Sequence, residues 1–288
     1  MSEIRVFGVI GAGQMGRGIA QVAAQSGFDV RLLDASLAQA EQGVARIGKD
    51  LSRQVERGKL DAATRDAALA RITPVGDYAG IAVCDFVVEA ATEVTDLKVK
   101  IFQQADAVLA PHAILASNTS SISLTKLAGV VKRPELVVGM HFMNPVPVMK
   151  LVEVIRALQT SEATYATTRA LAERMGKTLI TAKDVPGFIV NRMLIPFLNE
   201  GCFALQEGLG TAEDIDNGAK LGLNHPMGPF ELADLIGLDT VLSIAEVLHR
   251  EFGDDKYRPP TILRNYVAAG WLGRKTGRGF YDYSEKKA

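Results

Sequence analysis

The sequence predicts an α/β fold in which a doubly wound, mostly parallel sheet is followed by a second, all-α domain. Short β-rich runs alternate with helical segments over about the first two thirds of the 288 residues, a pattern typical of stacked βαβ units. A glycine-rich bend at 11–16 follows the first apolar run directly and leads into a helical segment. Beyond Pro186 and Gly187, long helical segments follow one another with little sign of a strand.

The predicted strands are short apolar runs with polar or turn residues at their ends. They are 4–10, 29–34, 84–91, 113–118, 136–142, 150–155 and 177–182. Between them, residues 98–110 and 161–175 have the composition of helices. Residues 36–71 are charged, contain no proline and are rich in good helix formers, so we expect two helices with a break near Gly58. We expect this helical pair to project from the sheet.

The change in composition predicts one domain at 1–185 and a helical C-terminal domain at 186–288. The helices of the second domain carry broad apolar stripes, wider than a domain of this size needs to cover its own core. Examples are Leu232, Leu235, Ile236, Val241 and Leu242. A self-complementary contact between two copies would cover this excess, so we predict a homodimer.

The composition argues against several kinds of partner. A net charge of -1 gives no global reason to bind nucleic acid or an anionic membrane, and we expect neither. Cys84 and Cys202 lie far apart in apolar stretches, which favours buried free thiols in a reducing compartment and hence a cytoplasmic protein. The glycine-rich bend begins too soon for a separate signal peptide, and no apolar stretch reads as a membrane span. No His/Cys cluster has the spacing of a metal site.

The spacing Gly11-x-Gly13-x-x-Gly16 gives each glycine its own physical reason. The first permits a tight turn, the second lets backbone N–H groups approach a pyrophosphate, and the third lets the helix pack close to the strand. Asp34 ends the next predicted strand, where a carboxylate can accept both hydroxyls of an adenosine ribose and would repel a 2′-phosphate. We therefore expect NAD in preference to NADP. The alternative for Asp34 is a turn residue at the end of a strand.

His141 is the histidine whose surroundings suggest chemistry. It ends a predicted strand at the edge of the sheet where ligands bind, and Glu153 lies in the next strand. The intervening segment 144–147, "NPVP", is a turn with two prolines that can bring the two side chains within hydrogen-bonding range. The carboxylate would then fix the imidazole tautomer and leave the other ring nitrogen free to take a proton from a substrate hydroxyl. The alternative is a structural His–Glu pair.

Three further groups admit two interpretations each. Ser120 and Ser121, in "SNTSS" at 117–121, are candidates for substrate contact or for capping the helix that follows. Asn191 begins a long helix and could reach a cleft between the domains or make a hydrogen bond at the domain junction. The basic residues of the helical pair form a solvated face or a site for a phosphorylated carrier. They are Lys49, Arg53, Arg57 and Lys59.

The chain resembles the short-chain L-3-hydroxyacyl-CoA dehydrogenases, in particular the bacterial 3-hydroxybutyryl-CoA dehydrogenases. The resemblance covers nearly the whole length. It rests on the ordered motifs "GVIGAGQMGRGIAQVAA", "DFVVEAA", "ASNTSSISLTKLA", "GMHFMNPVPVMKLVEVI", "DVPGFIVNRMLIPFLNE", "LGLNHPMGPFELADLIGLD" and "GRKTGRGFYDY". It implies a Rossmann-type NAD domain followed by a helical substrate and dimerisation domain.

The resemblance also implies roles for individual residues. His141 and Glu153 match the catalytic pair of the family, and Ser120 and Asn191 match residues that contact the substrate. The remaining matches concern ligand binding. On the cofactor side they are Gly11, Gly13, Gln14, Met15, Gly16, Asp34, Glu93, Lys98 and Asn118; on the side of the carrier they are Ser52 and Lys59.

We therefore predict an oxidoreductase that transfers a hydride between NAD(H) and C3 of a short-chain 3-hydroxyacyl-CoA, with His141 as general acid and base. Two alternatives stay open at this point. A dehydrogenase of free 3-hydroxy acids would be expected to carry a lysine in the helix that links the domains, and residues 188–201 contain none. The other alternative is a protein that binds NAD without catalysis.

Overall fold

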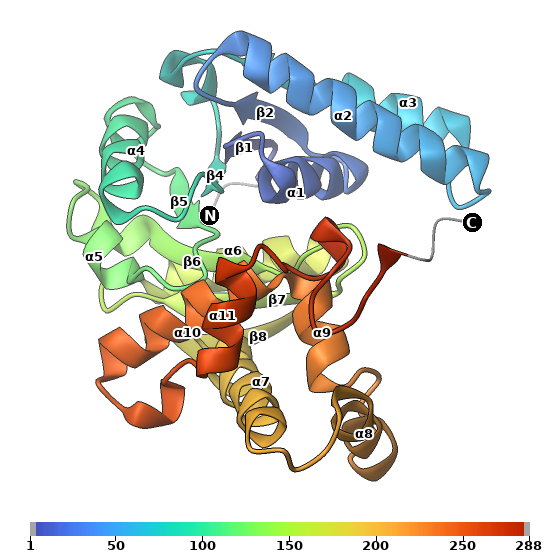
Figure 1. Ribbon diagram of the computed structural model, residues 1–288. Coiled ribbons are helices and arrows are strands. Elements are labelled where there is room, and N and C mark those ends of the chain that lie inside the picture. The colour runs from blue at the N-terminus through green and yellow to red at the C-terminus, as the bar shows by residue number, and fades with distance from the viewer. Residues whose placement is uncertain (1–3, 285–288) are drawn as a thin grey trace. The chain divides into compact units, whose positions relative to one another are not determined.

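The computed structural model describes residues 4–284, which form two compact units divided between Val185 and Pro186. The first unit is built on one sheet, and the second is helical (Figure 1). Among the described residues of the second unit, β-structure is limited to isolated bridges at 273, 278 and 282. The prediction of an α/β part followed by a helical part is therefore confirmed. No helix within 4–284 has the length and apolarity that crossing a membrane requires.

The first unit contains one eight-stranded sheet with the order β3-β2-β1-β4-β5-β6-β7-β8. Its strands are β1 (Val6–Ile10), β2 (Asp29–Leu33), β3 (Ile72–Val75), β4 (Phe86–Glu89), β5 (Ile114–Ser117), β6 (Val137–Phe142), β7 (Leu151–Arg156) and β8 (Thr178–Lys183). Strands β1 to β6 pair in parallel, β7 runs antiparallel to β6, and β8 is parallel to β7. The chain reverses its winding direction next to β1, which is where doubly wound sheets bind their ligands.

Strand β3 is the element that the sequence pattern did not predict. It is short and contains Pro74, which cannot donate a hydrogen bond to a neighbouring strand. The strand lies at the edge of the sheet, where the missing N–H is tolerated.

The helices of the first unit follow the alternation with strands. They are α1 (Gln14–Gln25), α2 (Leu37–Glu56), α3 (Ala62–Ala70), α4 (Thr95–Val108), α5 (Leu124–Ala128) and α6 (Glu162–Arg174), with short 3-10 turns η1 (Tyr78–Ile81) and η2 (Pro134–Leu136). Helices α2 and α3 are the expected pair, and the break falls at Gly58, whose φ of 66° suits glycine. In Figure 1 the pair lies beside α1. Ile47 and Leu51 of α2 are buried in the core of this unit, while the opposite face is exposed.

The second unit consists of helices packed around an apolar core. They are α7 (Val190–Gln206), α8 (Ala212–Asn217), α9 (Pro229–Ile236), α10 (Leu238–Phe252) and α11 (Thr261–Ala268), with short turns η3 (Gly218–Gly222), η4 (Asp255–Tyr257) and η5 (Arg274–Thr276). Phe230, Leu248 and Tyr257 are among its buried core residues.

Two buried carboxylates anchor the C-terminal segment of the second unit. Asp234 accepts hydrogen bonds from the backbone N–H groups of Phe280 and Tyr281, both at 3.0 Å. Asp216 accepts one from the Tyr281 hydroxyl at 2.7 Å. Burial raises the pKa of Asp234, and the nearby Asp216 adds to the effect. These contacts fix Phe280 and Tyr281 against α8 and α9.

Candidate active site

The glycine-rich loop joins β1 to α1, and the structure supports a separate reason for each glycine. Gly11 has a φ of 105°, and a Cβ there would lie 2.8 Å from the carbonyl oxygen of Ala90. A Cβ at Gly16 would overlap the carbonyl oxygen of Gly11, so only glycine allows this close packing of helix and strand. Gly13 caps the N-terminus of α1, and a Cβ there would meet nothing within 4 Å. The backbone at Gly13 is therefore open to a ligand, and the helix N-terminus favours an anion.

Asp34 follows β2 and is bonded to this loop. Its Oδ2 accepts a hydrogen bond from the backbone N–H of Ala12 at 2.5 Å, and its Oδ1 accepts one from Ala35 at 2.7 Å. The carboxylate is therefore more than a turn residue at the end of a strand, because it also holds the glycine-rich loop in place.

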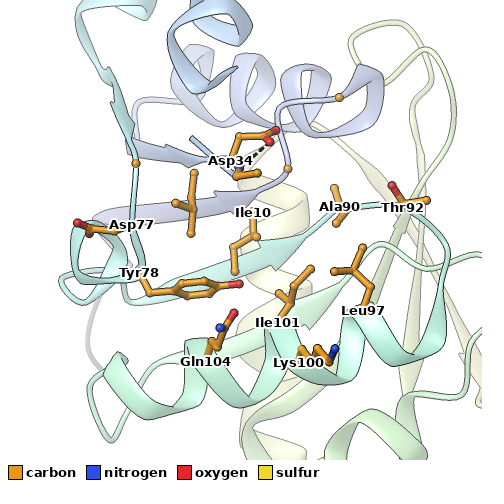
Figure 2. A pocket seen from close by; sticks show the side chains of 16 residues that line it. Ile10, Asp34, Asp77, Tyr78, Ala90, Thr92, Leu97, Lys100, Ile101 and Gln104 are labelled. Atoms are coloured by element: carbon orange, nitrogen blue, oxygen red, sulfur yellow. Dashed lines mark hydrogen bonds between the residues drawn. The ribbon is translucent and has the colours of Figure 1, made fainter. Parts of the chain in front are cut away.

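A cavity of about 570 Å³ lies in the first unit, between the loop, the ends of β1, β2 and β4, and helix α4. Figure 2 shows Asp34 on one side of it, with Tyr78 from η1 and Ile101 from α4 on the other. Its volume is in the range of small-molecule sites. The combination of open space at Gly13, a carboxylate at the end of β2 and apolar walls fits the adenosine part of a dinucleotide. Tyr78 and Gln104 line the cavity but have no motif in the sequence that could have indicated it.

His141 and Glu153 are directly opposite each other in the antiparallel pair of β6 and β7. The imidazole Nδ1 lies 2.8 Å from Glu153 Oε2, and the two residues are 5% and 0% exposed. The predicted contact is therefore confirmed. A carboxylate beside Nδ1 accepts a hydrogen bond from Nδ1–H, and Nε2 of a neutral ring is then the acceptor.

The turn that brings these two strands together is held by a buried lysine. Lys177 Nζ donates hydrogen bonds to the carbonyl oxygens of Val146 at 2.6 Å and Met149 at 2.8 Å. Burial lowers the pKa of Lys177. The Asn144–Pro145 peptide bond in this turn is cis. Nothing in the local sequence pointed to Lys177, because it lies beyond the following strand and helix.

Ser120 faces the other ring nitrogen of the same histidine. Its Oγ lies 3.0 Å from His141 Nε2, so a hydroxyl stands where a substrate oxygen would need to be held. Ser120 and Ser121 do not cap α5, because the helix begins later and its N-cap is Ser123, whose Oγ accepts from the N–H of Lys126. The capping alternative for Ser120 and Ser121 is therefore wrong.

Glu93 and Lys98 belong to a chain of charged groups behind Ser120. Lys98 is 1% exposed, and its Nζ lies 2.7 Å from Glu89 Oε1 and 3.3 Å from Glu93 Oε2. Burial raises the pKa of Glu93, but the charge of Lys98 and the hydrogen bonds from Thr119 and Ser120 outweigh it and leave that pKa below its ordinary value. Glu89, a carboxylate at the end of a fully buried strand, is a member of this group that the sequence analysis missed.

Three further predicted cofactor residues lie near the loop and β6. The Asn118 side-chain oxygen accepts a hydrogen bond from the N–H of Phe142 at 2.9 Å, which ties the end of β5 to the end of β6. Gln14 Nε2 donates to the side-chain oxygen of Asn144 at 3.1 Å. Met15 is half-buried against the core. These contacts connect the loop with the turn after His141.

The remaining predicted residues lie away from this group or in the other unit. Ser52 is half-buried in α2, and Lys59 is exposed in the turn between α2 and α3. Lys49, Arg53 and Arg57 are exposed as well, which agrees with either interpretation of these basic residues. Asn191 is buried in the first turn of α7, in the second unit.

Comparison with known families assigns both units. Residues 6–185 match the NAD-binding domain of 3-hydroxyacyl-CoA dehydrogenase, and residues 187–283 match the C-terminal domain of the same family. A probable 3-hydroxybutyryl-CoA dehydrogenase from Bacillus subtilis (strain 168) is 53% identical over 284 residues, which are 99% of this chain and 99% of that protein.

Two other proteins extend the comparison. The crystal structure of (S)-3-hydroxybutyryl-CoA dehydrogenase from Ralstonia eutropha is 53% identical with a TM-score of 0.94, and the match covers 98% of this chain and 100% of that one. The 3-hydroxyadipyl-CoA dehydrogenase of Escherichia coli (strain K12) is 39% identical over 288 residues, which are 100% of this chain and 61% of that protein. The chain therefore belongs to the 3-hydroxyacyl-CoA dehydrogenase family, a family of oxidoreductases with an NAD-binding domain.

Proposed function

We propose that the protein is an NAD-dependent 3-hydroxybutyryl-CoA dehydrogenase, in which His141 is the general acid and base. The observation that carries the proposal is the position of His141, with Glu153 at Nδ1 and Ser120 at Nε2. The names of the relatives from Bacillus subtilis and Ralstonia eutropha support the substrate. The Escherichia coli relative is named for a longer, dicarboxylic acyl group, so the named relatives differ in the acyl part of the substrate.

In the oxidation, His141 takes the proton of the C3 hydroxyl at Nε2 as the C3–H bond breaks, and in the reduction it returns that proton. Glu153 holds the ring and stabilises the imidazolium that forms. Ser120 and Asn191 position the substrate oxygen. NAD⁺, when bound, supplies the acceptor of the hydride that leaves C3.

The cofactor is held by residues of the first unit in this proposal. Backbone groups at Gly11, Gly13 and Gly16 admit the pyrophosphate to the N-terminus of α1, and the Asp34 carboxylate accepts the ribose hydroxyls. Further contacts come from side chains near the loop and the end of β5. They are Gln14, Met15, Glu93, Lys98 and Asn118. The cavity beside Asp34 supports this assignment, since its walls and its volume suit adenosine.

The CoA carrier is received by the α2–α3 pair in this proposal, with Ser52 and Lys59 as contacts. A cation is the side chain that a phosphate requires at an exposed site, and Arg53 and Arg57 add positive charge near Lys59.

We also propose that the protein is a cytoplasmic homodimer, with the second unit as its contact surface. Large apolar side chains are exposed on that unit, which supports a covering partner. They are Leu209, Leu221, Leu223 and Leu235. Two buried free thiols, Cys84 and Cys202, support a reducing compartment.

The deciding experiment follows the absorbance of reduced nicotinamide while the purified protein is mixed with acetoacetyl-CoA and either NADH or NADPH. We expect a fast loss of absorbance with NADH and a much slower one with NADPH. Free acetoacetate serves as the matched control, because it has the same reacting ketone without the carrier. Turnover of acetoacetate at the rate of the thioester would contradict the role of CoA and favour a dehydrogenase of free acids.

A further inference from the structure

The segment 119–121 between β5 and α5 owes its shape to one carboxylate oxygen. Glu93 Oε1 accepts hydrogen bonds from the backbone N–H of Ser120 at 2.9 Å and of Ser121 at 3.1 Å. It also accepts from the hydroxyls of Thr119 and Ser121. Four donors from three consecutive residues thus converge on one atom. A carboxylate oxygen is a strong acceptor for backbone N–H groups, so this arrangement fixes the conformation of the segment.

The other oxygen of Glu93 is held from behind by a cation that is itself fixed. Lys98 Nζ lies 3.3 Å from Glu93 Oε2. The same ammonium group lies 2.7 Å from the fully buried Glu89 and donates to the carbonyl oxygen of Ala91 at 3.2 Å. The Glu93 side chain is 39% exposed, but both of its oxygens have partners within the first unit.

This arrangement determines where the Ser120 hydroxyl lies relative to His141. Ser120 is the central residue of the fixed segment, and its Oγ lies 3.0 Å from His141 Nε2. A rotation or shift of the segment would move that hydroxyl away from the ring nitrogen where the proton is exchanged. A misplacement of about 1 Å at a reacting group can cost on the order of a hundredfold in rate.

We propose that Glu93 is a positioning residue for the reaction, which acts through Ser120 by fixing residues 119–121 against His141, with Lys98 as its support. This role rests on the proposed function, and it is additional to the cofactor contact proposed for Glu93. A direct contact with the cofactor would make Glu93 matter chiefly for the affinity of NADH. A positioning role makes it matter for kcat, and only while Ser120 is present.

A double-mutant cycle separates these two roles. Ser120→Ala, Glu93→Ala and the double variant are assayed with acetoacetyl-CoA, and the Kd of NADH is measured by fluorescence. We expect Glu93→Ala to lower kcat at saturating NADH at least about tenfold and to add nothing to the loss of kcat in Ser120→Ala. Glu93→Gln keeps one acceptor oxygen and should restore part of kcat. Multiplicative losses in the double variant, or a kcat of Glu93→Ala at saturating NADH within about threefold of the wild type, would overturn the proposal.

Asp184 provides the matched control for stability. It is a neighbouring carboxylate that accepts hydrogen bonds from the backbone N–H groups of Leu124 and Thr125, at the start of α5, and does not bond to Ser120. Asp184→Ala should lower the melting temperature, and its effect on kcat should multiply with that of Ser120→Ala. If Asp184→Ala shows the same coupling as Glu93→Ala, the effect is general loosening of the fold and the positioning role is wrong.

A measurement without substrate distinguishes a failure of this inference from a failure of the proposed function. The ¹⁵N shift of His141 Nε2, assigned with a His141→Gln variant, reports the hydroxyl of Ser120 at a fixed pH. Glu93→Ala and Ser120→Ala should move this resonance in the same direction, and Glu93→Gln should move it less. An unmoved resonance in a folded Glu93→Ala protein contradicts the positioning role. Absence of turnover by the wild type contradicts the proposed function alone.

Discussion

At the scale of single residues, Asp34 has both a structural role and a proposed binding role. One oxygen of its carboxylate binds the glycine-rich loop at Ala12, while the side chain also lines the cavity. In the proposed function, the preference for NAD and the shape of the loop therefore depend on the same group. A substitution that keeps the size of the side chain and removes its charge separates the two roles.

Asp34→Asn should lower the ratio of kcat/KM for NADH to that for NADPH by about tenfold or more, because the charge that repels a 2′-phosphate is gone. Steady-state assays with both cofactors measure this ratio. Asp29→Asn is the control, since Asp29 lies at the opposite end of β2, where it is exposed and paired with Arg71. An unchanged ratio in Asp34→Asn would show that discrimination lies elsewhere.

His141→Gln should lower kcat by about a thousandfold, the usual size of a lost general acid and base, and leave the Kd of NADH within about threefold. His112→Gln is the matched control in the same unit, because His112 is exposed and lies 3.3 Å from Asp85. Steady-state assays measure kcat, and fluorescence titration measures the Kd of NADH. Equal turnover of the wild type and His141→Gln would remove His141 from the mechanism.

The sequence allowed the prediction of those site residues that lie close together along the chain. His141 and Glu153 are joined by a single turn, so their contact follows from the strand pattern and the two prolines. The choice between capping and site contact for Ser120 depended on where α5 begins, and helix starts are uncertain by a few residues. Tyr78 and Gln104 come from separate elements and reach the cavity only through the tertiary fold.

At the scale of elements, the loop between β1 and α1 shows how one motif combines a structural and a binding requirement. Gly16 has no room for a Cβ, while Gly13 has open space. The two positions look alike in the sequence, since both are glycines of the same motif. Their surroundings in the fold make them respond differently to the same substitution.

Gly16→Ala should destabilise the protein by about 1–3 kcal/mol, because the added methyl overlaps the carbonyl oxygen of Gly11. Gly13→Ala should have the same thermal stability as the wild type. It should bind NADH at least about tenfold more weakly, because its methyl occupies the open approach to the loop. Thermal unfolding and fluorescence titration of the two variants test this contrast. Equal stability of both variants would contradict it.

Most strands and helices of the first unit follow from apolar runs and their punctuation, including the break at Gly58. Strand β3 escaped prediction because its proline argues against a strand, and only its edge position makes the proline harmless. The order of the strands likewise comes from packing, since no local signal says which strands become neighbours.

At the scale of the whole molecule, each of the two units contains one buried cysteine, and neither cysteine forms a disulfide. Cys84 lies in the first unit and Cys202 in the second, and both are free. Burial raises the pKa of each thiol to about 12. At neutral pH both thiols therefore stay protonated and unreactive.

At pH 8, unfolded chains react completely with a thiol reagent. Over the same time, less than about a tenth of a thiol per chain should react in the native protein. Raising the pH toward 10 should change this little, because the thiolate forms only near the raised pKa. The absorbance of the chromophore that the reagent releases gives the number of thiols that have reacted. The protein unfolded in denaturant serves as the reference, in which both thiols react. Rapid reaction of one thiol in the native protein would show that one of the units opens.

The antiparallel pairing of β6 and β7 affects how His141 and Glu153 can be separated by recombination during evolution. Two residues that face each other across a hairpin are encoded by one continuous stretch, here 141–153, whereas most sites in parallel sheets combine residues from distant parts of a gene. Recombination outside this stretch leaves the imidazole and its carboxylate together. A descendant with a rebuilt cofactor loop or a new helical unit can thus keep the pair intact, and a single short segment is enough to transfer it.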